Sequence, residues 1–270
     1  ESANYIARGI REIGRGGVTS VNIHGDSQMK LDVWADVVIL KRLNEETGFG
    51  VFEFASEEQD EVIVIGRNKL GKQGRYSVTA DPLDGSSLIG VNSSIGSIFG
   101  IHDGAIISGR PSREGLVAAA YALYGPTTTL VVGVNGKTHE FILDEARNWV
   151  LQTESIRMEN KGSIYGSGVL RRDWTRKHKE YIERLENEGY KLRYGGAFVS
   201  DFNSVLMKKG GMFAYPGSMK RPEGKLRVLF ELQPMSLLAE CADGRATNGI
   251  DNILDTAPEK LDQRSPIYIG

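Results

Sequence analysis

The chain is poor in cysteine and has no long apolar run, and both absences narrow what it can do. Cys241 is the one cysteine among 270 residues, so a disulfide within the chain and control by an internal dithiol are excluded. A lone thiol fits a reducing compartment, and we expect a cytoplasmic protein. Apolar runs of about 18 residues, the length that spans a bilayer, do not occur, so no membrane partner is predicted.

A strong excess of charge of one sign is also lacking. The 33 Lys and Arg residues nearly balance the 35 Asp and Glu residues, which leaves a net charge of −2 and no strong attraction to polyanions. The densest basic segment, residues 171–179, interleaves with acidic residues and is typical of a solvated helix face, so no nucleic-acid partner is expected. With 40% hydrophobic and 25% charged residues, the composition is that of a globular protein of one large or two smaller domains.

The most informative stretch is Asp81-Pro82-Leu83-Asp84-Gly85-Ser86-Ser87, which follows the apolar alternation of residues 76–80. It predicts a strand that delivers two carboxylates, then a tight turn and two hydroxyls. Pro82 cannot donate a backbone hydrogen bond, so we expect strand pairing to end at this step. Gly85 permits a backbone conformation that other residues resist. The two serines after it are expected to cap the next segment and leave N–H groups for an anionic oxygen.

A second acidic cluster, at residues 56–60, follows the apolar run of residues 51–55. Each cluster alone is equally well explained as a polar surface turn, because Asp, Pro, Gly and Ser are common turn residues. Two strands that both end in carboxylates are instead typical of a hard-cation site, since Mg²⁺ prefers carboxylate, carbonyl and phosphate oxygens. The sequence therefore predicts a metal-phosphate site. Its expected ligands are Glu57, Asp81, Asp84 and the Leu83 carbonyl.

Two further charged elements belong to the candidate site. Asp26 lies in a predicted loop and Asp32 near a helix start, where helix capping explains each aspartate about equally well. Residues 225–230 are predicted as a strand. That strand would place four side chains on one face, namely Lys225, Arg227, Leu229 and Glu231. Charges on such a face are costly without charged partners, and phosphates and a metal ion are natural ones.

Hydrophobic periodicity predicts helices beside a sizeable sheet in the first half of the chain. The predicted helices there are residues 4–13 and 31–43, and the predicted strands are residues 62–65, 76–80, 95–102, 116–123, 128–134 and 138–143. In the second half we expect helices at residues 174–188, 198–207 and 234–241. We expect two tightly packed α/β domains, an N-terminal one with the metal site at residues 1–158 and a C-terminal substrate-binding one at residues 159–270.

Several motifs together resemble class I fructose-1,6-bisphosphatases and their relatives, the sedoheptulose-1,7-bisphosphatases. They are GDSQMKLD, ASEE, DPLDGSS, YALYGPTT, LRYGGAFVSDFN, GKLRVLFELQPM and the closing LDQRSPIYIG. The resemblance covers nearly the whole chain and lacks only part of the N-terminal segment. It implies a layered α-β-α-β-α sugar phosphatase fold of the lithium-sensitive phosphatase superfamily. It also implies a homo-oligomer, a dimer or tetramer, that acts in gluconeogenesis or Calvin-type carbon metabolism.

The activity that the resemblance implies is hydrolysis of the 1-phosphate of fructose 1,6-bisphosphate, with about two or three Mg²⁺ ions per site and Mn²⁺ as a substitute. The implied metal ligands are Glu57, Asp81, Leu83, Asp84 and Glu231. The residues implied to orient and deprotonate the attacking water are Asp26, Asp32 and Glu58. The implied 1-phosphate contacts are Gly85, Ser86, Ser87 and Arg227. The implied contacts to the sugar and distal phosphate are Lys225, Tyr194 and Tyr215, with Arg193 reaching across from a neighbouring subunit.

Departures from the fructose-bisphosphatase pattern concern the substrate. Residues 165–171 lack the side-chain donors that the family places near the 6-phosphate, and this region resembles the sedoheptulose branch. Sedoheptulose 1,7-bisphosphate, or dual specificity, is therefore an alternative. A non-catalytic sugar-phosphate sensor is an alternative of another class. An inositol-phosphatase-type enzyme would carry a Trp-Asp-x-Ala-Ala-Gly motif, which is absent. AMP inhibition is not predicted, because Arg113 does not match the family's AMP-binding arginine.

Overall fold

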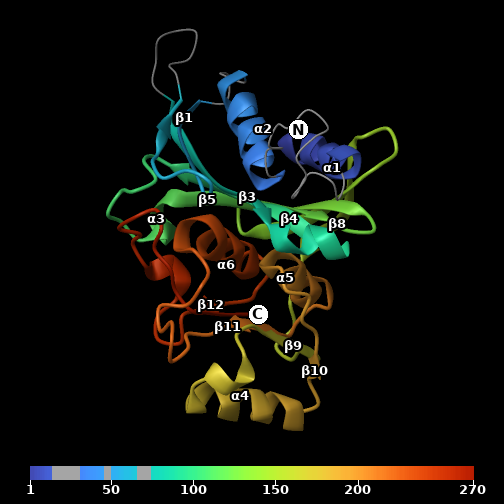
Figure 1. Cartoon of the computed structure of the whole chain (residues 1–270), viewed down its shortest axis with the longest axis vertical. Helices are drawn as coiled ribbons and strands as arrows, with labels where there is room; N and C mark the ends of the chain where they lie inside the picture. Colours follow the sequence, from blue (N-terminus) through green and yellow to red (C-terminus); the bar gives the residue numbers. More distant parts are fainter. Residues whose placement is uncertain (14–30, 46–49, 66–73) are drawn as a thin grey trace, which may run out of the picture.

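The computed structural model describes residues 1–13, 31–45, 50–65 and 74–270. Its helices and strands stack as α-β-α-β-α layers, with the N-terminal helices outermost at one end and α4 outermost at the other (Figure 1). This arrangement confirms the expected layered α/β fold. Asp26 lies outside the described residues. Within them, no helix is both long and apolar enough to cross a membrane.

The larger sheet has eight strands in the order β2-β1-β3-β4-β5-β6-β7-β8. Their bounds are β1 Val51–Ser56, β2 Ile63–Val64, β3 Tyr76–Asp84, β4 Ile95–Asp103, β5 Leu116–Tyr124, β6 Thr128–Val134, β7 Lys137–Leu143 and β8 Trp149–Ile156. The pair β1·β3 is parallel, and every other neighbouring pair is antiparallel. The strands predicted from residue 62 to 143 all belong to this sheet. The edge strand β8 was not predicted, because its residues are mostly exposed and lack a clear alternation.

Two helices, α1 (Ser2–Ile13) and α2 (Leu31–Glu45), cover one face of this sheet. Both confirm predicted helices. Their apolar residues Ile6 and Ile39 are buried in one cluster with Phe54 of β1 and Val78 of β3. Burial of these side chains between helix and sheet stabilises the layer, because apolar area leaves water on both surfaces.

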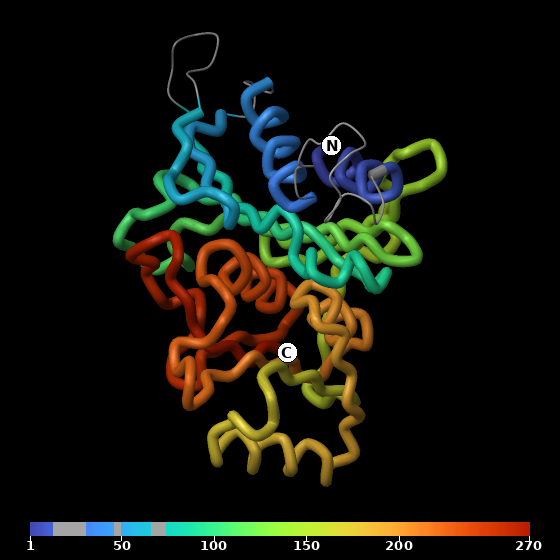
Figure 2. Tube along the Cα trace, viewed as in Figure 1, coloured from blue at the N-terminus to red at the C-terminus, as the bar shows by residue number. Residues whose placement is uncertain are grey.

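The opposite face of the larger sheet packs on α5 (Phe198–Met207) and α6 (Gln233–Glu240). Beneath these helices lies a second sheet of five strands, in the order β10-β9-β11-β13-β12 (Figure 2). Its bounds are β9 Ile164–Ser167, β10 Lys191–Leu192, β11 Met212–Tyr215, β12 Ala246–Thr247 and β13 Ile267–Ile269. One hydrophobic cluster joins Tyr121 of β5, Phe202 of α5 and Phe213 of β11, so α5 and α6 form the layer between the two sheets.

The outer face of the smaller sheet is covered by α4 (Arg176–Asn187), which fills most of the helix predicted at residues 174–188. Ile182 of α4 is buried against Tyr165 and Met212 of the sheet. Two basic residues of this region form exposed ion pairs with acidic residues of α4, Arg171 with Glu183 at 3.6 Å and Arg176 with Glu180 at 2.6 Å. This pairing confirms the predicted solvated helix face. The domain division at residue 158 stays a prediction.

The remaining described elements are short: α3 Ser112–Gly115, η3 Ser86–Val91, η4 Arg171–Asp173, η5 Val228–Leu232 and η6 Ile253–Asp255. The element η5 corrects the sequence prediction. Residues 225–230 were expected to form a strand, yet residues 228–232 form a π-helical turn that continues into α6. The Pro234 ring would clash with the carbonyl four residues earlier in a regular α-helix, which favours the wider turn before it. The expected shared face of alternating residues therefore does not exist.

Candidate active site

Because β1 and β3 pair in parallel, the two acidic clusters lie together at the carboxyl ends of these neighbouring strands. Ser56 at the end of β1 lies in register with Ala80 of β3, and the Glu57 N–H donates to the Ala80 carbonyl at 3.0 Å. Glu57 directly follows β1, and Asp81 directly follows Ala80 within β3. The inference from the sequence that two neighbouring strands end in carboxylates is confirmed.

The turn after Ala80 is shaped by its own side chains. Asp81 accepts a hydrogen bond from the Leu83 N–H at 3.0 Å, an arrangement that closes a tight turn around Pro82. Pro82 does not end the strand as predicted, because pairing with β4 resumes at Asp84 after an irregularity. Ser97 of β4 donates to the Pro82 carbonyl at 2.7 Å and holds the irregular segment in place.

Gly85 follows with φ 82°, the left-handed region that glycine adopts without strain. A Cβ at this position would lie 2.5 Å from the Cβ of Ala197, so the close approach of α5 also requires glycine. Gly85 is the N-cap of η3, and no side chain caps that helix. Ser86 and Ser87 are therefore residues of the first turn, which corrects their predicted capping role.

Glu231 enters the site from the π-helical turn η5. Its side chain is 5% exposed, and it accepts a hydrogen bond from the Arg227 N–H at 2.6 Å. The Arg227 guanidinium lies 3.2 Å from the Glu57 carboxylate and donates to the Glu57 carbonyl at 2.8 Å. The turn and the arginine thus tie the chain near residue 230 to the end of β1.

Asp81, Asp84 and Glu231 converge so that one carboxylate oxygen of each lies within 4.8 Å of the others. Burial, reinforced by the charge of Glu57, raises the pKa values of Asp81 and Glu231 well above the ordinary carboxyl range. Burial also raises the pKa of Asp84 to about 7, although the Val199 N–H donates to it at 2.6 Å. Buried carboxylates so close together are costly unless a cation compensates their charge. Hard oxygen donors of this kind suit Mg²⁺, so the residues present fit a divalent ion.

Glu58, the next residue after Glu57, has a raised pKa for related reasons. Burial is the main cause, and the charges of Asp32, Glu57 and Asp36 add to it. Asp36, fully buried in α2, accepts a hydrogen bond from the side-chain amide of Gln59. A carboxylate with a raised pKa can accept a proton near neutral pH.

The acidic cluster opens into a hollow of about 200 Å³. The predicted site residues that line it are Glu57, Glu58, Asp81, Leu83, Asp84, Gly85, Ser86, Ser87, Tyr194, Tyr215, Lys225 and Glu231. The Lys225 ammonium lies 5.8 Å from the centroid of the Tyr215 ring. Burial raises the pKa of Tyr194 to about 12, so its phenol stays a hydrogen-bond donor at neutral pH.

Three predicted residues in the described part of the chain do not line this hollow. Asp32 lies in the first turn of α2, and Arg227 is engaged with Glu57. Arg193 faces a separate hollow beside Ser93 and Ser94. Asp26 is outside the described residues.

Two charged lining residues were not predicted as site residues. Asp201 is 7% exposed and accepts hydrogen bonds from the N–H groups of Gly195 at 2.6 Å and Gly196 at 3.1 Å. Arg264 donates a hydrogen bond to the Lys225 carbonyl. Asp201 occurs in the LRYGGAFVSDFN motif. The helical pattern of the residues around it does not predict that its side chain contacts the loop before the helix.

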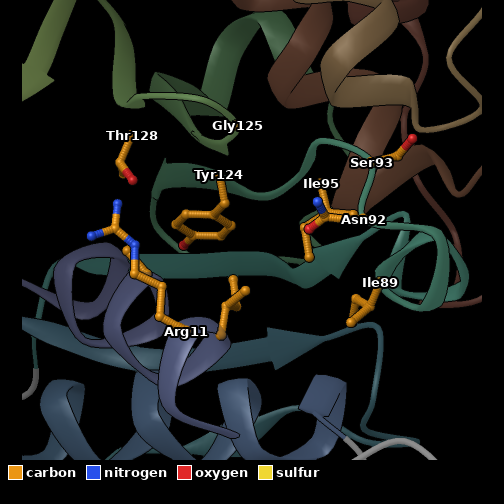
Figure 3. Close-up of a pocket in the computed structure, with 10 residues that line it drawn as sticks. Arg11, Ile89, Asn92, Ser93, Ile95, Tyr124, Gly125 and Thr128 are labelled. Carbon is orange, nitrogen blue, oxygen red and sulfur yellow. The ribbon is translucent and has the colours of Figure 1, made fainter. Parts of the chain in front are cut away.

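A different hollow, of about 420 Å³, lies between α1, η3 and the end of β5. Figure 3 shows the Arg11 side chain of α1 extending toward Thr128, and the Tyr124 ring lying between Arg11 and Asn92. Among the described residues, those that line it carry no carboxylate. It therefore offers no hard-cation ligands, and the smaller acidic hollow is the better candidate for phosphate chemistry.

Comparison with known proteins gives two family matches that follow one another along the chain. Residues 1–154 match the family described as Fructose-1-6-bisphosphatase, N-terminal domain. Residues 158–270 match Fructose-1-6-bisphosphatase, C-terminal domain. Together the two matches cover nearly every residue.

Individual relatives agree with these matches. The chain is 44% identical over 270 residues to a class 1 fructose-1,6-bisphosphatase of Trichlorobacter lovleyi, covering all of this chain and 84% of the relative. It is 43% identical, at the same coverage, to one from Geobacter sulfurreducens. The crystal structure of Leishmania major fructose-1,6-bisphosphatase in holo form is similar with a TM-score of 0.87 and 33% identity, over 100% of this chain and 87% of that one. The chain belongs to the class 1 fructose-1,6-bisphosphatase family.

Proposed function

We propose that this protein hydrolyses the 1-phosphate of fructose 1,6-bisphosphate to fructose 6-phosphate and phosphate, and that Mg²⁺ is its cofactor. The observation that carries the proposal is the buried convergence of Asp81, Asp84 and Glu231 at the floor of a hollow that also contains Lys225. The carboxylates can bind a metal cation, and the Lys225 ammonium can bind a phosphate in the same hollow. Family membership supports the same reaction.

The three carboxylates, with Glu57 and the Leu83 carbonyl, would hold the ions. When bound, the ions supply positive charge that lowers the pKa of a water and stabilises the leaving oxygen. Glu58 orients that water and accepts its proton, a role to which its raised pKa is suited. Asp32 assists by its charge next to Glu58, and Asp26 is proposed for the same task on the resemblance alone.

The reacting phosphate is held by Gly85, Ser86 and Ser87 at the edge of the hollow, with Arg227 behind Glu57. Most of the catalysis is then positioning and charge stabilisation, as is general for phosphoryl transfer. The sugar and its distal phosphate extend toward Lys225, Tyr215 and Tyr194. Arg193 points to a different hollow of its own chain, which fits the proposal that it serves the site of a neighbouring copy in a homo-oligomer.

Sedoheptulose 1,7-bisphosphate is the second candidate substrate, and the end of β9 favours it. Residues 165–171, at the end of this strand and after it, lack the side-chain donors that the family places near the 6-phosphate.

The test is phosphate release from both bisphosphates, measured side by side with Mg²⁺ and then with EDTA. Metal-dependent release from the fructose substrate supports the main proposal, and the ratio of the two kcat/KM values assigns the branch. If a bisphosphate binds but no phosphate is released from either substrate, the result favours a sugar-phosphate sensor. If the protein neither binds the bisphosphates nor releases phosphate, the enzyme and the sensor proposals are both overturned.

A further inference from the structure

We infer that Asp201 is a positioning residue that holds the loop of residues 193–196 in the shape that the distal half of the substrate requires. The inference deepens the proposed function and rests on it. Asp201 lies in the first turn of α5, where it is buried and lines the acidic hollow. Asp201 is not one of the three carboxylates whose oxygens converge within 4.8 Å, and its own oxygens accept from two backbone N–H groups of the preceding loop.

The two contacts of Asp201 act as a clamp. One carboxylate oxygen accepts from the Gly195 N–H at 2.6 Å and the other from the Gly196 N–H at 3.1 Å. Hydrogen bonds to an ionised acceptor are stronger than neutral ones. Gly196 has φ 99°, a conformation that its lack of a side chain allows, so the clamp stabilises a backbone that would otherwise sample many states.

The other end of the loop is also fixed. The Arg193 N–H donates to the Tyr165 carbonyl of β9 at 2.7 Å. Tyr194 therefore lies between two anchored points, one on the smaller sheet and one on α5. Tyr194 lines both the acidic hollow and the neighbouring one, whereas Arg193 lines only the neighbouring one. The clamp thus sets the direction of both side chains proposed to hold the distal phosphate.

The same helical turn also contacts the metal end of the site. The Val199 N–H donates to Asp84 at 2.6 Å, only two residues before Asp201. One rigid turn of α5 therefore fixes the distance between the proposed metal ligands and the loop with Tyr194. Loss of the clamp at Asp201 is expected to free the distal loop and leave the contact at Asp84 in place.

The test compares the wild-type protein with Asp201→Asn, which keeps the size of the side chain but turns one acceptor into an NH₂ donor facing an N–H. We expect the KM for fructose 1,6-bisphosphate to rise about tenfold, with kcat changed less than about threefold. For fructose 1-phosphate, which lacks the distal phosphate, kcat/KM should stay within about twofold of wild type. Equal losses on both substrates, or no loss on either, would overturn the inference.

A double-mutant cycle sharpens the result. If Asp201 acts through the loop, Asp201→Asn combined with Arg193→Ala should be no worse than Arg193→Ala alone. Fully additive losses contradict the inference. Ser204→Ala is the matched control, since Ser204 lies on the same helix and its hydroxyl donates to the Ser200 carbonyl at 3.0 Å rather than accepting from the N–H groups of the two glycines. Its kinetic constants should equal those of wild type.

A measurement without turnover keeps the inference separate from the proposed activity. Amide hydrogen exchange of the segment 193–197 in the metal-free protein should become faster in Asp201→Asn and not in Ser204→Ala. Unchanged exchange would refute the clamp even if the protein proved to act on a different ester. Should Asp201→Asn not fold, Asp201→Glu retains the charge with displaced oxygens and is expected to give the same exchange result in weaker form.

Discussion

The backbone N–H of Arg227 donates a 2.6 Å hydrogen bond to the carboxylate of Glu231 four residues later. The same arginine reaches Glu57 with its side chain. Arg227 therefore connects the carboxylates of Glu57 and Glu231, which are 174 positions apart in the chain. The charge of its guanidinium offsets part of the negative charge that converges in the site.

Gly85 is the residue at which the turn after β3 and the start of α5 meet. Gly85→Ala adds a Cβ within 2.5 Å of the Ala197 Cβ and forces alanine to φ 82°. We expect a loss of about 2 kcal/mol or more in the free energy of unfolding and a lower kcat. Denaturant unfolding and phosphate release measure these. Gly90→Ala is the control, because a Cβ there meets nothing within 4 Å; equal stability of the two variants would contradict the packing argument.

His178 predicts a dependence of stability on pH. Its ring is 2% exposed between Ser167, Tyr268 and Trp174, and burial lowers its pKa to about 4. Between its ordinary pKa of about 6.5 and this value, the unfolded chain binds a proton that the folded chain does not, so stability falls as the pH falls. His178→Gln should flatten this fall by about 1.4 kcal/mol per pH unit.

The measurement for His178 is the free energy of unfolding in urea from pH 7 to pH 4.5. Burial also lowers the pKa of His102 to about 4, so His102→Gln should flatten the curve similarly. Curves that stay parallel to that of wild type in both variants would show that these histidines do not control acid stability.

Arg113 joins parts of the chain that lie far apart in sequence. It pairs with Glu240 of α6 at 2.7 Å and with Asp255 of η6 at 2.6 Å. Networks of this kind contribute more than single exposed pairs. Arg113→Ala should lower the free energy of unfolding by about 1 kcal/mol, whereas Arg176→Ala, which removes an exposed pair within one helix, should change it by less than about 0.5 kcal/mol. Thermal unfolding distinguishes the two, and an equal effect would contradict the structural role.

Part of the site was predictable because local patterns placed its carboxylates. Glu57 and Asp81 each follow an apolar run, and such runs become neighbouring strands whose ends coincide. The helix at residues 198–207 was predicted with its bounds, since its apolar spacing is regular. These features depend on the local hydrophobic period of the sequence, and contacts with residues far away in the chain affect them little.

Other features depended on distant partners and were predicted wrongly or not at all. Residues 225–230 alternate like a strand, but a proline and a buried glutamate with partners on β3 favour a π-helical turn. The strands of the smaller sheet span a few residues each and gave no period to detect. The role of Asp201 depends on a loop folding back onto its helix, which no local pattern encodes.

We propose that the buried carboxylates Asp81, Asp84 and Glu231 bind the divalent cation with which the protein hydrolyses a sugar bisphosphate. The decisive experiment measures phosphate release from fructose 1,6-bisphosphate as a function of Mg²⁺ concentration, for wild type and Asp84→Asn. We expect wild type to turn over only with the metal, and Asp84→Asn to fold but to lose on the order of a thousandfold in kcat, because several kcal/mol of charge stabilisation are removed. Release by Asp84→Asn at the wild-type rate, or release by wild type in EDTA, would contradict it.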